Sequence, residues 1–183
     1  MHDSLIDSIT SYASLSEQEI DLFIEKLETK KFGKGELLLA IGDVCMGWAF
    51  VNKGSFREYY TDEEVNEVIT NLFTENKWAL NHASFTSRKP SQSKIEAFEE
   101  SEVFFINIED LHDLIHKSPS YFALGKILEV EANRLQSNAT PEEKYLQLLE
   151  HNPKIIQVFP LKFIASYLGM TPETLSRVRR KIQ

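Results

Sequence analysis

The chain has 183 residues, of which 42% are hydrophobic and 26% charged, with a single cysteine and a formal net charge of −8. This composition allows one ordinary domain or two small ones around a real apolar core, and it excludes an internal disulfide or a cysteine-ligated cluster. No apolar run is long enough to cross a bilayer and the acidic start is unlike a signal peptide, so we expect a cytoplasmic protein with no membrane partner.

The charge is divided unevenly along the chain. Residues 1–140 hold 13 Lys and Arg against 24 Asp and Glu, whereas residues 141–183 hold seven against four, and residues 161–183 five against one. The acidic bulk and the basic end predict two modules, with modest non-specific affinity for a phosphate backbone.

The amino-terminal part predicts a short helical lead-in followed by strands. Ser16 and Glu19 have the spacing of a capping box and precede an apolar-periodic segment. Between residues 28 and 108, short runs rich in Phe, Val, Ile and Tyr are separated by Gly or by polar clusters. Many short strands without intervening helices indicate an antiparallel barrel, sandwich or roll.

Helices are predicted after the strands: a short one after Ile108, one of about 20 residues from Pro119 to Asn138, and one over residues 141–151. The long helix has apolar residues on two sides and therefore needs two neighbours, which we interpret as its own roll and a second subunit. The alternative is a helix buried within one monomer. The candidate dimer-helix positions are Leu124, Ile127, Leu128, Glu131 and Leu135.

The last 24 residues predict a helix-turn-helix. Apolar residues recur at helical spacing from Leu161 to Leu168, Gly169 suits the left-handed end of a helix, and Thr171-Pro172 supplies an N-cap followed by proline. In the second helix the apolar residues lie on one side, opposite Glu173, Ser176, Arg177 and Arg180. Such a helix suits the major groove of DNA. The alternative is an ordinary surface helical hairpin.

Two segments together resemble the Crp/Fnr-type bacterial transcription regulators. FGKGELLLAIGD (32–43) and AFVNKGSFREYY (49–60) resemble the start of a cyclic-nucleotide-binding β-roll, and ASYLGMTPETLSRVRRKI (165–182) resembles the family's helix-turn-helix. The resemblance spans about residues 15–183. It implies an α+β fold: a jelly-roll-like antiparallel β-roll with a long dimerisation helix over residues 1–138, and a winged-helix-like DNA-binding module over residues 139–183.

The resemblance also implies partners and contact residues. We expect a homodimer on a near-palindromic double-stranded DNA site, with RNA polymerase as a further candidate partner. Glu173 and Arg177 match family positions that touch base edges, while Thr171, Ser176 and Arg180 are candidates for phosphate contacts. Pro172 replaces an arginine common in the family, so the DNA target is expected to differ from the best-known family sites.

The expected effector pocket departs from the family members that bind cyclic AMP. Those carry Gly-Glu-Leu followed by Arg-Ser/Thr-Ala, whereas here Asn81-His82 stands near the place of the glutamate and residues 90–93 near the place of the arginine. Without the charge of the arginine and the close backbone approach that the glycine allows, most of the interactions that would bind a cyclic phosphate are missing. Cyclic AMP is therefore not expected to bind, and the effector is unknown. The candidate pocket residues are Asn81, His82, Arg88, Ser91, Ser93 and Lys94.

Other chemistries find little support in the sequence. His112 and His116 lie four residues apart on a predicted helix, but no third metal ligand is evident, and we expect no resident cofactor. The ligand set of a metal-dependent jelly-roll enzyme, a Ser-His-Asp arrangement and a phosphate loop are all missing, so we expect no catalytic activity. The remaining alternative is a ligand-binding or scaffolding protein of the same fold that does not bind DNA.

Overall fold

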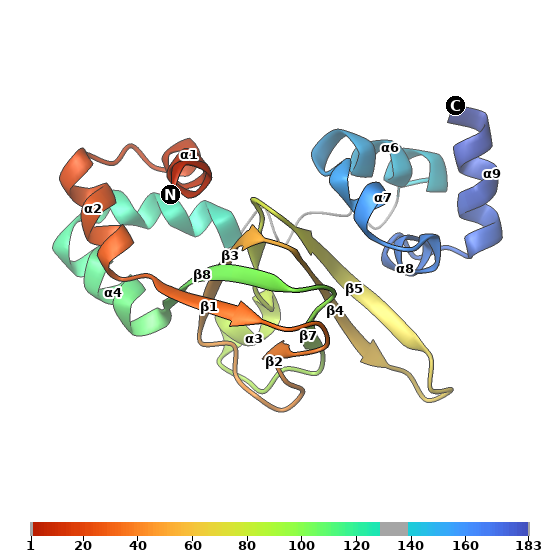
Figure 1. The fold of residues 1–183 in the computed structure, drawn as a ribbon, viewed down its shortest axis with the longest axis horizontal. Helices are drawn as coiled ribbons and strands as arrows, with labels where there is room; N and C mark the ends of the chain where they lie inside the picture. Colours follow the sequence, from red (N-terminus) through yellow and green to blue (C-terminus); the bar gives the residue numbers. More distant parts are fainter. Residues whose placement is uncertain (1, 129–138, 183) are drawn as a thin grey trace.

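The computed structural model describes residues 2–128 and 139–182. Two four-stranded sheets form its centre, with α1, α2 and α4 at one end and α6 to α9 at the other (Figure 1). The helices of the first part are α1 (Asp3–Tyr12), α2 (Glu17–Glu25), α3 (His82–Ser87), α4 (Ile108–Lys117) and the 3₁₀ helix η1 (Pro119–Gly125).

The strands pair antiparallel throughout, in the orders β1-β8-β3-β6 and β2-β7-β4-β5. Their side chains enclose an apolar core between the two sheets. This confirms the predicted antiparallel roll. The strands are β1 (Glu28–Phe32), β2 (Leu37–Leu39), β3 (Gly47–Lys53), β4 (Ser55–Thr61), β5 (Glu67–Thr74), β6 (Trp78–Ala79), β7 (Lys94–Ala97) and β8 (Ser101–Asn107).

Local chemistry fixes several ends of these elements. Ser16 and Glu19 form the predicted capping box at the start of α2. Gly54, between β3 and β4, has a φ of +85°, and a Cβ there would lie 2.3 Å from Ser101 Oγ. Only glycine fits such a turn, where the backbone is left-handed and a neighbouring strand passes close by.

The expected long helix differs from the prediction at its start. Residues 119–125 form a 3₁₀ helix and only residues 126–128 are α-helical, while residues 129–138 lie outside the described part. Leu124 and Ile127 are each 1% exposed and belong to the roll's own core, and Leu128 packs against it half-buried. Glu131 and Leu135 lie outside the described residues, so the dimer helix stays a prediction.

The carboxyl-terminal module consists of four helices, and residues 139–182 contain no strand. The prediction of a helix over residues 141–151 is correct, and Thr140 caps it with Glu143 as a second capping box. The helices are α6 (Pro141–His151), α7 (Lys154–Val158), α8 (Leu161–Tyr167) and α9 (Pro172–Ile182). No helix in the described ranges combines the length and apolarity needed to span a membrane.

A second apolar core joins this module to the roll. Tyr59, Ile69 and Leu72, from β4 and β5, are buried in the same cluster as the core residues of α6 to α9. Helices α7 and α8 pack directly against β5, whereas α9 lies on the side of the module away from the sheets (Figure 1). The outer face of β4 and β5 therefore serves as the base on which the module sits.

Candidate DNA interface and sensor pocket

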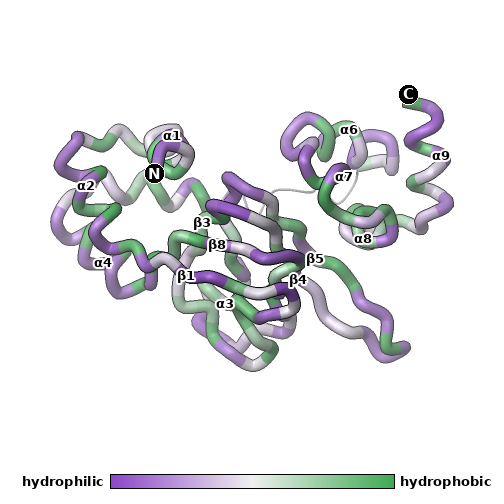
Figure 2. The backbone as a smooth tube through the Cα atoms, viewed as in Figure 1, coloured by the Kyte–Doolittle hydropathy of each residue, from purple (hydrophilic) through white to green (hydrophobic). Residues whose placement is uncertain are grey.

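Helix α9 presents one apolar and one polar face. Leu175 is 1% exposed and Val178 3% exposed, and both pack into the module core. Most of α9 is hydrophilic (Figure 2). The candidate DNA-contacting side chains, on the side opposite Leu175 and Val178, are all exposed: Glu173, Ser176, Arg177 and Arg180. Helix α9 therefore presents a cationic, hydrogen-bonding surface to a partner, and its buried apolar face anchors it to the module.

The turn before α9 is built as the sequence predicts. Gly169 has a φ of +67°, and Thr171 Oγ1 accepts a hydrogen bond from the Thr174 backbone N–H at 3.2 Å. The backbone N–H of Glu173 and the hydroxyl of Thr171 lower the pKa of the Glu173 carboxyl, with Arg177 adding to the effect. Glu173 is thus held as an exposed carboxylate, an acceptor of the kind that a cytosine amino group requires.

Arg179 is a further basic residue in the last turn of α9. It is half-buried, and its Nε is enclosed without a hydrogen-bond partner among the described residues. Lys181 forms an ion pair with Glu142 of α6 at 2.9 Å and so ties α9 to the rest of the module. These contacts do not favour a role in reading DNA bases for either side chain.

A buried polar cluster occupies the expected sensor pocket. Asn81 Nδ2 donates to Glu58 Oε1 at 2.6 Å and to Ser93 Oγ at 2.9 Å, and the Ser93 hydroxyl donates to the same glutamate oxygen at 2.5 Å. All three side chains are less than 9% exposed. Strand β4 thus places a carboxylate between the residue that caps α3 and the residue that precedes β7.

Neighbouring hydrogen bonds fix the cluster in place. Asn81 Oδ1 accepts from the Ser84 backbone N–H at 2.7 Å and so caps α3, while the Ser84 hydroxyl accepts from Cys45 N–H at 2.9 Å. The buried Ser91 hydroxyl donates to the carbonyl of Ser93 at 2.6 Å. Burial raises the pKa of the Glu58 carboxyl, against the opposing effect of the Ser93 and Asn81 hydrogen bonds.

The structure separates the other predicted pocket residues from this cluster. His82 is half-buried within α3, and Arg88 is exposed just after that helix. Lys94 lies 4.0 Å from Glu96 and over the Tyr59 ring, on the other face of β7 from Ser93. The sequence therefore identified two members of the cluster, Asn81 and Ser93, and their neighbour Ser91, but it missed the centre of the cluster, Glu58.

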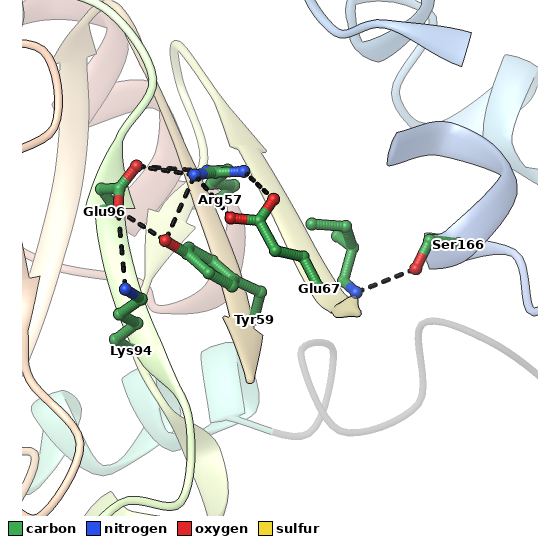
Figure 3. Close-up of polar contacts among 7 residues, drawn as sticks. Arg57, Tyr59, Glu67, Lys94, Glu96 and Ser166 are labelled. Carbon is green, nitrogen blue, oxygen red and sulfur yellow. Dashed lines mark hydrogen bonds and ion pairs between the residues drawn. The ribbon is translucent and has the colours of Figure 1, made fainter. Parts of the chain in front are cut away.

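A second network lies on the outer face of β4, beneath the helical module (Figure 3). The Arg57 guanidinium donates to Glu67 at 2.7 Å and to Glu96 at 2.9 Å, and the Tyr59 hydroxyl donates to Glu96 at 2.6 Å. Although burial by itself would raise it, the pKa of Glu96 is lowered by the hydrogen bonds from Tyr59 and Arg57. The same guanidinium lies 4.9 Å from the ring of Phe163 in α8.

Backbone and side-chain contacts then connect β5 to the module. The Ile69 N–H, on the edge strand of its sheet, donates to Ser166 Oγ of α8 at 2.9 Å (Figure 3). Asn152 Oδ1 accepts from the Thr74 hydroxyl at 3.1 Å, and Lys154 forms an ion pair with Glu75. Because the contacts are both apolar and polar, they fix the module in one pose on the roll.

The pairing of a roll with a helical module agrees with comparisons to known proteins. Residues 29–118 match the cyclic nucleotide-binding domain family. The fumarate and nitrate reduction regulatory protein of Yersinia pestis is 27% identical over 99% of this chain and 79% of its own length. The chain is thus similar in sequence to a regulator of this type, and it shares the fold of the solved structures below.

Solved structures of Crp/Fnr-type proteins share the fold. FixK2 from Bradyrhizobium japonicum superposes with a TM-score of 0.66 at 16% identity, over 85% of this chain and 84% of that one. The c-di-GMP-responsive global regulator CLP of Xanthomonas campestris gives a TM-score of 0.59 at 17% identity, over 92% of each chain. The Yersinia pestis and Xanthomonas campestris proteins are regulators, and the fold is the predicted roll followed by a helix-turn-helix.

The residues that the structure describes form no cluster suited to a metal ion. In the described part of the chain, no three His, Cys, Asp or Glu side chains gather at a metal-binding distance. Cys45 is buried, its Sγ–H donates to the Gly47 carbonyl at 3.4 Å, and burial raises the pKa of its thiol. It has the environment of a core residue and not of a reactive one.

Proposed function

We propose that the protein is a sequence-specific, DNA-binding transcription regulator that acts in the cytoplasm. The observation that carries this proposal is the division of α9: Leu175 and Val178 are buried, while Glu173, Arg177 and Arg180 are exposed on the opposite side. In this assignment Arg177 and Glu173 read base edges, and Thr171, Ser176 and Arg180 contact phosphates.

The regulator acts as a homodimer. Two copies of α9 related by a two-fold axis would face half-sites about one helical turn apart on a near-palindromic element. The segment around residues 138–141 sets the relative pose of the two DNA modules, and an effector acts by its differential affinity for the competent pose. RNA polymerase is the further partner that a regulator of this type would contact.

Cyclic AMP is not the effector in this proposal. Glu58 places a carboxylate among the donors Asn81 and Ser93, so those donors are already satisfied and a cyclic phosphate would meet a like charge. No arginine takes part in the cluster, whose hydrogen bonds come from Asn and Ser. The degenerate pocket is thus closed by the chain itself.

The test of DNA binding is a double substitution, Arg177→Ala with Arg180→Ala. DNA fragments are first selected with the wild-type protein, and the affinity of the variant for the selected site is then measured at several salt concentrations. Losing one base-reading and one phosphate contact per half-site should weaken specific binding about 100-fold or more, while the melting curve stays unchanged.

The matched control removes the same charge elsewhere: Lys31→Ala with Lys34→Ala, both exposed near the ends of the first sheet. This variant should keep nearly full affinity for the selected site. Equal affinities of the two variants would refute the assignment of α9. A wild-type protein that selects no sequence would favour the alternative, a scaffolding protein of the same fold.

A further inference from the structure

Three charged residues lie in one line along α9. Glu173, Arg177 and Lys181 follow one another at intervals of four residues, so they lie on the same side of the helix. All three are exposed, and the side chain of Lys181 is 71% exposed. The side of α9 assigned to base reading therefore ends in a lysine within the last turn of the helix.

A carboxylate from another helix pairs with this lysine. Helices α6 and α9 pack against each other (Figure 1), and Lys181 Nζ lies 2.9 Å from Glu142 Oε1. Glu142 belongs to the first turn of α6, which the capping box of Thr140 and Glu143 holds in place. Within residues 139–182, Lys181 is the only cation of α9 that forms an ion pair with a described carboxylate.

The charge of Glu142 also interacts with Arg177. The hydrogen bond from Lys181 is the main cause that lowers the pKa of the Glu142 carboxyl, and the positive charge of Arg177 adds a smaller effect in the same direction. Glu142 is therefore ionised at neutral pH and lies near the cationic side of α9. Unlike Glu173, it belongs to a helix that is not assigned to base reading.

An exposed ion pair of this kind has different consequences for folding and for DNA binding. Such pairs contribute little to the free energy of folding. A free lysine that reaches a phosphate releases a counterion and strengthens binding to DNA of any sequence. A lysine paired with a carboxylate adds no net positive charge, and the carboxylate itself repels phosphates. The pair between α6 and α9 therefore weakens the attraction of this surface for the DNA backbone.

We propose that Glu142 occupies Lys181 in place of a DNA phosphate and so lowers the affinity of α9 for DNA of any sequence. Glu173 and Arg177 remain free to read bases, because Glu142 forms its ion pair with the lysine alone. A larger share of the binding free energy then comes from base contacts. This role of Glu142 rests on the proposed function in one respect, namely that α9 is the surface that meets DNA.

The test is the substitution Glu142→Gln, which removes the charge and nearly keeps the size of the side chain. Fluorescence anisotropy measures binding of the full chain to a random-sequence duplex and to the selected site over a range of salt concentrations. The freed lysine gains a phosphate contact, so the affinity for both duplexes should rise about five-fold at about 0.1 M salt. The slope of log affinity against log salt should steepen by about one for each bound subunit.

Two further variants assign the gain to the pair. Glu150→Gln removes the same charge near the other end of α6, where the side chain is exposed, and both affinities should stay nearly unchanged. Glu142→Gln combined with Lys181→Gln should return to wild-type affinity, because neither member of the pair is left. A gain that persists in this double variant, or an equal gain in Glu150→Gln, would overturn the inference.

A purely structural role of the pair predicts the opposite sign. If the pair mainly held α9 in position, Glu142→Gln would lower the melting temperature and weaken binding to the selected site. We expect an unchanged melting curve and stronger binding, because the Glu142 side chain is 38% exposed and its ion pair contributes little to folding. Unchanged or weaker DNA binding by the Glu142→Gln protein would refute the role of Glu142.

The random-sequence duplex separates this inference from the proposed sequence-specific function. Suppose that wild type shows no sequence preference, but Glu142→Gln still binds random DNA more tightly. The base-reading assignment would then be wrong, and the role of Glu142 would be supported. A sequence preference in wild type with unchanged affinities in Glu142→Gln would refute only the role of Glu142. Absence of DNA binding by both proteins would refute both.

Discussion

Two carboxylates on neighbouring strands illustrate how single residues acquire opposite electrostatic behaviour. Glu58 points into the roll, where burial raises its pKa, with hydrogen bonds from Ser93 and Asn81 acting in the opposite direction. Glu96 points outward, where the Tyr59 hydroxyl and the Arg57 guanidinium outweigh its burial and lower its pKa. Folding therefore favours the protonated form of Glu58 and the ionised form of Glu96.

The raised pKa of Glu58 gives a prediction with a defined sign. A carboxyl whose folded pKa is raised contributes stability below its ordinary value, near 4.5, and loses that contribution as the pH rises through the folded value. Gln at this position keeps the oxygen that accepts from Asn81 and Ser93 but carries no charge. Glu58→Gln should therefore be more stable than wild type by about 1 kcal/mol at pH 7.5, and the difference should shrink toward pH 4.5.

Urea unfolding at several pH values measures this difference. The exposed Glu63→Gln is the matched control and should follow the wild-type pH dependence. If the free energy of unfolding depended on pH in the same way in wild type and Glu58→Gln, protonation of the Glu58 carboxyl would not be coupled to folding as we expect.

At the scale of elements, the helix-turn-helix depends on a short turn between α8 and α9. Its key position, Gly169, has a φ of +67°, and an added Cβ would come no closer than 3.8 Å to another atom, Lys144 Nζ. The position therefore demands glycine for its backbone conformation and not for lack of space.

Gly169→Ala isolates this backbone effect. The substitution should lower the free energy of unfolding by about 1 kcal/mol, because an L-residue is strained at positive φ. Gly125→Ala is the comparison, since a Cβ there also meets open space but the backbone φ is not positive. Thermal or chemical unfolding should show a lower stability than wild type only for Gly169→Ala. If the two variants were equally stable, the turn would accommodate alanine without measurable strain.

The contact between β5 and α8 has a role for both elements. Strand β5 is an edge strand, and Ser166 accepts the hydrogen bond that its Ile69 N–H would otherwise offer to solvent or to another chain. We predict that Ser166→Ala will raise the hydrogen-exchange rate of the Ile69 amide about five-fold or more, because one hydrogen bond of the docked pose is lost.

Ser176→Ala serves as the control for that measurement. Ser176 is exposed on α9, and its loss should leave the β5 amides protected as in wild type. Unchanged exchange at Ile69 in Ser166→Ala would show that the apolar contacts alone hold the module on the roll.

For the whole molecule, the arrangement links two different polar networks through one strand. Glu58 faces the buried cluster with Asn81 and Ser93, while Arg57 and Tyr59 on either side of it face the helical module. Alternation along β4 thus puts the sensor position and the docking surface back to back. A displacement of β4 at the Glu58 cluster would therefore also displace the residues that contact the helical module.

A closed pocket predicts that cyclic AMP will leave the whole molecule unaffected. A ligand that binds only the folded state raises the melting temperature, by several degrees for a domain of this size at a concentration 100-fold above Kd. Millimolar cyclic AMP should therefore produce no shift in a thermal melt of the full chain, with adenosine as the reference compound. A concentration-dependent upward shift would contradict the closure of the pocket by Glu58.

The sequence by itself determined the parts of the protein that depend on local chemistry. The capping box of Ser16 and Glu19, the left-handed Gly169 and the cap at Thr171 each involve residues within a few positions of one another, so their spacing is sufficient. The polar face of α9 is equally local, because helical periodicity alone separates Arg177 from Leu175. The features between Gly169 and Arg180 also lie in one of the segments that resemble the family.

Only the tertiary structure decided what the local patterns leave open. Glu58, Asn81 and Ser93 come from three elements, and no spacing rule joins residues 23 and 35 positions apart. Strand β1 has a largely polar sequence, and it forms by pairing with β8. Long-range pairing, burial and desolvation depend on the whole chain at once, and for that reason the Glu58 cluster and the docked module appear only in the folded molecule.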